Sequence, residues 1–179
     1  MKKGRKGVGS AISRCQLLYI INMEIDVVQL EIRKCYSIDI DVQTKEVYSA
    51  HSVARLFCEN IGALNIEHVA MLALDNANRI INYFTVSMGE IDKVKVSLSQ
   101  MFRCALLSNA SKIIIAHNHP SGVLEITSKD IEMTKKIAFW ANVFSIDLVD
   151  SLVVTANDYS SIRDYCKELV RGQESNNKD

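Results

Sequence analysis

The chain has 179 residues, 48% of them hydrophobic, which is enough for one well-buried core but short for two full domains. The 21 basic and 21 acidic residues cancel, which argues against a surface built to neutralise phosphates and against nucleic acid as the main partner. Five cysteines without a CxxC pair fit neither a disulfide framework nor a zinc ribbon, and a reducing cytoplasm is the simplest setting.

Residues 1–22 begin with basic residues and contain an apolar run of five residues, Leu17 to Ile21. A signal peptide needs an apolar region of about 7–15 residues, and a membrane span needs about 20. We therefore expect no association with a membrane. We predict a poorly ordered basic extension over residues 1–22, one folded domain over residues 23–170 and a disordered polar tail over residues 171–179.

Strand and helix patterns follow one another through the folded region. Branched apolar residues predict strands over residues 24–32 and 36–40. Helical spacing predicts a helix over residues 52–64, with Ser52 as its N-cap and Gly62 near its end. Two extended runs, residues 68–75 and 79–88, are separated by short polar residues that suit a tight turn, so they should pair antiparallel.

The second half of the chain alternates more regularly between the two patterns. An amphipathic helix is predicted over residues 97–109, a strand buried on both faces over residues 111–117 and a loop over residues 118–127. A long helix over residues 128–144, a strand over residues 145–155 and a closing helix over residues 159–170 follow. This alternation predicts an α/β fold in which helices cover a central mixed sheet.

His117 and His119 stand where the buried strand gives way to the loop. Alternate residues of an extended chain point to the same side, so the two imidazoles can converge on one point. Asp130 brings a carboxylate back at the start of the next helix. Two histidines and one carboxylate leave the fourth tetrahedral position of zinc to water, as in catalytic zinc sites. The pair Thr127 and Asp130 also resembles a helix-capping box, and the two roles are compatible.

A catalytic site of this kind also needs a base that takes the proton from the attacking water. Glu67 opens the extended run of residues 67–75, at the start of a strand that is a candidate neighbour of the histidine strand. The alternative is an ordinary exposed glutamate at a strand edge, and the residues alone favour that alternative.

Three features together resemble the JAB/MPN (JAMM) domain of RadC-like proteins: the segment AHNHPSG at 116–122, Asp130, and the upstream EHVAMLALDNANRII at 67–81. The family pattern is a glutamate, then H-x-H, seven residues, a serine, two residues and an aspartate. The match covers residues 25–165. It implies a JAB/MPN fold, a central mixed β-sheet flanked by helices in a cytidine-deaminase-like layered architecture.

The resemblance also implies roles for individual residues. His117, His119 and Asp130 would bind Zn²⁺, and Glu67 would be the general base. Thr127, which occupies the serine position, would help to hold the tetrahedral intermediate. The implied reaction is hydrolysis of a peptide or isopeptide amide, with a peptide or protein as substrate.

The chain departs from the family pattern in four places. Thr127 replaces serine, which keeps the hydroxyl but adds a methyl group. The segment DSLVV at 150–154 stands where RadC-like chains often read DHIIV, so Ser151 replaces a histidine, and SMGEIDKV at 87–94 departs from the usual S-x-G-T. The helix-hairpin-helix segment that precedes this domain in longer relatives is not expected here, so a DNA-binding role does not transfer.

Other residues receive simpler interpretations. His68 follows Glu67 and should face the opposite side of the sheet as a satisfied or surface histidine, and His51 carries no signal. Trp140 and Phe144 are four positions apart on the long helix, which is the spacing of packed core residues.

Three functions compete on this basis: a zinc-dependent hydrolase, a binding module that keeps the fold without turnover, and a DNA-repair-associated factor. The sequence favours them in that order. It names no substrate, and it leaves a homodimer open.

Overall fold

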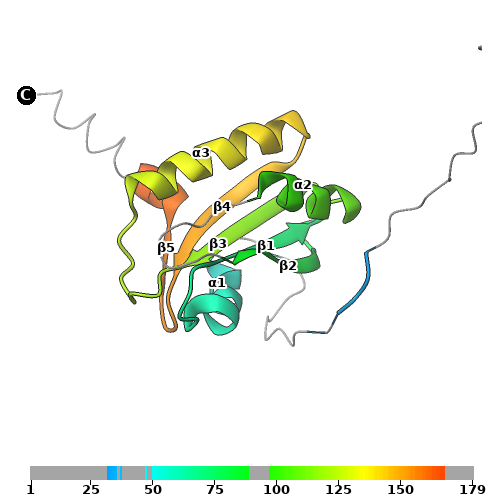
Figure 1. Ribbon diagram of the computed structural model, residues 1–179. Coiled ribbons are helices and arrows are strands. Elements are labelled where there is room, and N and C mark those ends of the chain that lie inside the picture. The colour runs from blue at the N-terminus through cyan, green and yellow to red at the C-terminus, as the bar shows by residue number, and fades with distance from the viewer. Residues whose placement is uncertain (1–31, 36, 38–46, 48–49, 89–96, 168–179) are drawn as a thin grey trace, which may run out of the picture. The chain divides into compact units, whose positions relative to one another are not determined.

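The computed structural model describes residues 32–35, 37, 47, 50–88 and 97–167, and these form a mixed five-stranded sheet with helices on both faces (Figure 1). The strands lie in the order β2-β1-β3-β4-β5. Neighbouring strands are antiparallel except for β3 and β4, which are parallel. Their bounds are His68–Leu74 for β1, Ile80–Met88 for β2, Lys112–Asn118 for β3, Asp147–Val154 for β4 and Tyr159–Ser161 for β5. The predicted α/β class and mixed sheet are confirmed.

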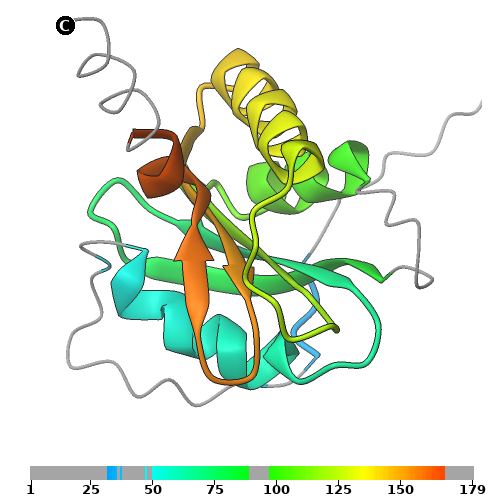
Figure 2. The same ribbon diagram turned by 90° about the vertical axis from the view of Figure 1, so that its left-hand side faces the viewer.

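Helices cover the two faces of the sheet with separate apolar cores (Figures 1 and 2). Helix α1, His51–Phe57, continues into a π-helical turn, η2, Cys58–Gly62, and lies on one face. Helices α2, Leu98–Leu107, and α3, Ser128–Val143, lie on the other. Because successive strand residues point to opposite faces, Ala70 and Leu72 of β1 pack with the α1 core, whereas Val69 and Met71 pack with the α2 and α3 core.

The hairpin of β1 and β2 is antiparallel, as its turn residues predict. Asn78 adopts a φ of 60°, in the left-handed region that asparagine tolerates better than most residues. Strand β3 also matches its prediction. Its residues from Ile113 to Asn118 are all buried, because helices cover both faces of the sheet at this central strand.

Two predicted boundaries are wrong. Ser52 is not an N-cap: the helix already begins at His51, after Ala50, whose carbonyl accepts a hydrogen bond from the Val53 amide at 3.2 Å. The closing helix does not begin at Tyr159, because residues 159–161 pair with the end of β4 as an edge strand. Helix follows only over residues 162–167 of the described chain.

Trp140 and Phe144 are not core residues, since they are 40% and 41% exposed. The buried positions of α3 in this region are Ile137 and Ala141, which leaves the two large rings at the margin of the packed face. The Phe144 ring instead packs against Phe102 of α2, with ring centroids 5.1 Å apart.

Several predictions lie outside the described residues. These are the basic extension over residues 1–22, the polar tail over residues 171–179 and almost all of the two strands predicted within residues 24–40. Within the described part of the chain, every helix is too short or too polar to cross a membrane.

Candidate metal centre

The two histidines lie at the C-terminal end of β3, where the sheet changes from antiparallel to parallel pairing. His117 is paired with Val69 of β1 on one side and Val153 of β4 on the other. It shares the orientation of Ile113 and Ile115, which face α2 and α3. His119 follows the strand, and its amide donates a hydrogen bond to the Val154 carbonyl at 3.1 Å. This bond holds the second imidazole close to the strand end.

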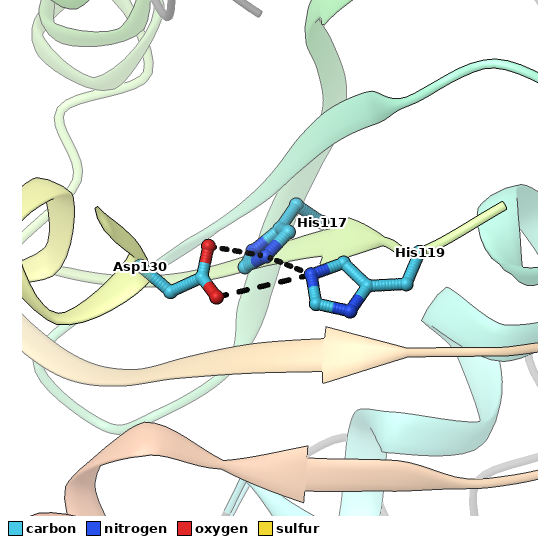
Figure 3. Close-up of side chains that lie close together, drawn as sticks. All are labelled: His117, His119 and Asp130. Atoms are coloured by element: carbon cyan, nitrogen blue, oxygen red, sulfur yellow. Dashed lines mark hydrogen bonds and ion pairs between the residues drawn. The ribbon is translucent and has the colours of Figure 1, made fainter. Parts of the chain in front are cut away.

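Helix α3 brings the carboxylate to the two imidazoles (Figure 3). The Nε2 atoms of His117 and His119 are 3.2 Å apart. The Oδ1 atom of Asp130 lies 3.2 Å from Nε2 of His117, and its Oδ2 atom lies 3.8 Å from Nε2 of His119. The three side chains are well shielded from solvent, at 5%, 17% and 8% exposure for His117, His119 and Asp130.

These distances fit a tetrahedral metal ion. Zinc bonds to nitrogen and oxygen are about 2.0–2.2 Å long, so tetrahedral geometry places neighbouring ligand atoms roughly 3.3–3.6 Å apart. The three separations, 3.2, 3.2 and 3.8 Å, bracket that range. Among the described residues, His117, His119 and Asp130 are the one group of three or more histidine, cysteine and acidic side chains close enough to hold a metal ion.

Asp130 is both a helix-capping residue and a member of this group. Its Oδ2 atom accepts hydrogen bonds from the Thr127 amide at 2.8 Å and from the Thr127 hydroxyl at 2.7 Å, and the Asp130 amide donates back to that hydroxyl at 3.3 Å. Burial raises the pKa of the Asp130 carboxyl, but the bonds from His117 and Thr127 outweigh it and hold the pKa well below its usual value. Asp130 is therefore an ionised carboxylate held in one orientation, which suits it to bind a metal cation.

His119 has a second contact that orients its ring. Its Nδ1 atom lies 2.8 Å from the carbonyl oxygen of Val123, in the loop between β3 and α3. A carbonyl oxygen can only accept, so Nδ1 carries the proton in this bond. In the neutral imidazole, the lone pair is then on Nε2, which is the atom that faces His117 and Asp130.

Thr127 and Glu67, the two residues predicted as catalytic, differ in how they relate to the three-residue group. The Thr127 hydroxyl contacts the Asp130 carboxylate directly. Glu67 is half-buried and immediately precedes β1, and it is not a member of the three-residue group. The register of β1 on β3 ends at the pair of Val69 and His117. Extended by two residues, that register would set Glu67 beside His119. Alternation along the chain gives Glu67 the same side of the sheet as Val69. His68 faces the other way and is satisfied by the Ile66 carbonyl at 2.9 Å, as predicted.

Sequence reasoning passed over Asn118, between the two histidines. It is fully buried, and its side chain makes three hydrogen bonds to the backbone of residues 64–68. A polar residue at the end of a continuous apolar strand is the signal that marks it, because a buried amide must find partners.

A mixed sheet between helix layers, with two histidines and an aspartate gathered at the end of its central strand, defines an α/β domain with a candidate metal centre. Comparison with protein families names it more closely. The family described as RadC-like JAB domain matches residues 47–168, which is more than half of the chain. The chain belongs to this family.

Similar proteins are named UPF0758 protein, a name that states no activity. A UPF0758 protein of Finegoldia magna is 38% identical over 112 residues, which are 63% of this chain and 50% of that protein. UPF0758 proteins of Chloroflexus aurantiacus and Clostridium novyi are each 31% identical over 118 residues, which are 66% of this chain and 52% of those proteins. The chain thus spans about half the length of the curated relatives it matches.

Proposed function

We propose that this protein is a zinc-dependent hydrolase that cleaves an amide, either a peptide or an isopeptide bond. The observation that carries the proposal is the meeting of His117, His119 and Asp130 at separations of 3.2–3.8 Å. Three protein ligands leave one tetrahedral position for water, which separates catalytic zinc sites from closed structural ones.

The ligand residues are prepared for this role by their own contacts. Zinc, when bound, would supply a Lewis acid that polarises the scissile carbonyl and lowers the pKa of water. His119 is held with Nε2 toward the centre by its Val123 bond, and Asp130 is held by Thr127. Such supporting bonds fix ligand geometry before the metal arrives.

Glu67 is the proposed general base. It would take a proton from the attacking water and deliver it to the leaving nitrogen, and for that it must come within hydrogen-bond reach of the water. The β1 register, which would set Glu67 beside His119 if extended by two residues, supports this role. Thr127 is proposed to assist by holding the Asp130 carboxylate with its backbone amide and its hydroxyl.

The proposed substrate is a peptide or protein, and the proposed setting is the reducing cytoplasm. Within the described residues, Cys35, Cys58, Cys104 and Cys166 are all free thiols, which supports that setting. The balanced charge of the chain disfavours nucleic acid as a direct partner.

Elemental mass spectrometry of protein purified without a histidine tag tests the metal. We expect about one zinc per chain, lost in a His117→Ala, His119→Ala double variant and retained in a His51→Ala control, because His51 is exposed on α1, on the other face of the sheet. A lack of zinc in the wild type, even after incubation with zinc, would refute the proposal that the protein is a zinc-dependent hydrolase.

Activity is tested separately from the metal. A panel of peptide and isopeptide substrates is incubated with the zinc-loaded protein, and Glu67→Gln serves as the inactive control. Zinc binding with equal, background rates for wild type and Glu67→Gln on every substrate would instead favour a JAB-type binding module that has lost turnover.

A further inference from the structure

Asn118 connects the strand that carries the candidate metal ligands to the segment that carries Glu67. Its chain neighbours are His117 and His119, and its own side chain is fully buried. Strand alternation turns the Asn118 side chain to the face opposite His117. There it meets residues 64–68, the segment that leads into β1.

The Asn118 carboxamide uses both of its ends on this segment. Its Oδ1 atom accepts a hydrogen bond from the His68 amide at 2.6 Å. Its Nδ2 atom donates to the carbonyls of Leu64 and Ile66, at 3.0 Å and 3.1 Å. Both amide protons and the oxygen are therefore engaged, which is what a fully buried asparagine requires.

Two of these bonds lie on either side of Glu67. The Ile66 carbonyl belongs to the peptide group that precedes the Glu67 Cα, and the His68 amide belongs to the peptide group that follows it. One carboxamide thus bonds to both peptide groups that flank Glu67 and restrains the backbone dihedrals of that residue. The His68 ring also donates to the Ile66 carbonyl, at 2.9 Å, so this carbonyl accepts two hydrogen bonds.

Ordinary strand pairing does not supply this anchor. The ladder between β1 and β3 runs from Leu74 to Val69, and its last pair is Val69 with His117. The next position would join His68 to Asn118, and there the Asn118 side chain replaces the backbone as the acceptor. Without it, the segment that carries Glu67 would lose its side-chain tie to β3, while His68 would stay paired with Met88 of β2.

We propose that Asn118 is a positioning residue: it sets the Glu67 carboxylate at a fixed place relative to the metal held by His117 and His119. The inference rests on the proposed function, in which Glu67 is the general base. A base must be held within about 0.5 Å of its productive position, and here the same three-residue stretch carries the anchor and two of the three candidate ligands.

The test loads the protein with Co²⁺, which takes zinc-type ligand sets and shifts the nuclear magnetic resonance signals of nearby atoms. In the wild type we expect the Glu67 side-chain signals to be shifted by the metal. In Asn118→Asp, which has the same shape but turns an acceptor toward two carbonyls, and in Asn118→Ala, that shift is lost. The imidazole signals of the ligand histidines and the cobalt stoichiometry stay as in the wild type, which a general structural defect would not allow.

The matched control is Asn82→Asp, which makes the same chemical change on β2, where Asn82 donates to the Ser108 hydroxyl at 3.1 Å. Glu67 should keep its wild-type metal shift in this variant. Folded Asn118 variants that also keep the wild-type Glu67 shift would overturn the proposal.

A measurement on the wild type covers the case in which the Asn118 variants do not fold. The His68 amide and the Asn118 carboxamide protons should exchange with solvent as slowly as the amides of β1. Exchange at the rate of free groups would overturn the proposal whatever the variants do. If the wild type binds no cobalt, the proposed hydrolase fails instead, and slow exchange alone then decides whether Asn118 fixes the Glu67 backbone.

Discussion

Thr127→Val tests whether the threonine at the family's serine position supports the candidate metal ligand Asp130. Valine has nearly the shape of threonine but cannot donate or accept a hydrogen bond. The change removes the 2.7 Å bond from the Thr127 hydroxyl to Asp130 Oδ2 and the 3.3 Å cap from the Asp130 amide to that hydroxyl. The 2.8 Å bond from the Thr127 amide to Oδ2 remains.

The size of the effect follows from these bonds. A hydrogen bond to a charged group contributes about 1.5–3 kcal/mol and an N-cap about 1 kcal/mol, but the two share one hydroxyl and do not add. Thr127 is exposed, so water replaces part of the loss. We therefore expect the free energy of unfolding to fall by about 1–2 kcal/mol. Zinc affinity should weaken about tenfold, at the low end of what loss of an outer-shell partner costs.

Chemical denaturation of the metal-free protein measures the stability, and competition with a chromophoric zinc chelator measures the affinity. Thr127→Ser is the matched control, because it keeps the hydroxyl and should retain both wild-type values. A Thr127→Val protein with wild-type stability and wild-type zinc affinity would refute the reasoning.

Three further changes have expected outcomes. In Gly62→Ala the new Cβ would collide with the backbone oxygen of Thr155, so we expect the free energy of unfolding to fall by about 1–3 kcal/mol in denaturant unfolding. An unchanged midpoint would contradict this close approach. Ser151→Ala removes the 3.0 Å bond from the Thr134 hydroxyl that ties α3 to β4, and it should cost about 1 kcal/mol in the same assay; equal stability would show that this bond contributes nothing. Zinc at about one hundred times its dissociation constant should raise the free energy of unfolding by about 2.7 kcal/mol, and the same gain in His117→Ala would place the metal elsewhere.

Much of the fold could be predicted because its elements are long and strongly patterned. The buried run that became β3 and the helical spacing that became α2 and α3 leave few alternatives. Strand β5 was missed because it has only three residues, and pairing with the end of β4 outweighs the helical pattern that surrounds it. The exposure of Trp140 was missed because spacing alone does not say how far the packed face of a helix extends.

In the candidate site too, residues with a local sequence signal could be predicted and residues that depend on long-range contacts could not. His117, His119 and Asp130 could be proposed from residue type and spacing, because a strand end and a helix start are local features. Glu67 could be singled out only through the family resemblance, since a glutamate before a strand is common. Asn118 could not be assigned a role at all, because its three partners lie 50 to 54 positions earlier in the chain and only the folded sheet brings them together.

The topology explains why the segments that carry the proposed base and the candidate ligands lie at one end of the sheet. Strand β1 is antiparallel to β3, so the start of β1 lies beside the end of β3. Glu67 precedes the first, His117 lies in the second and His119 follows it, so the strand pairing brings the segments that carry these residues to the same end of the sheet. A slip of one residue in this pairing would turn Glu67 to the opposite face from His117. The side-chain anchor of Asn118 on His68 opposes such a slip at the position where the backbone ladder ends.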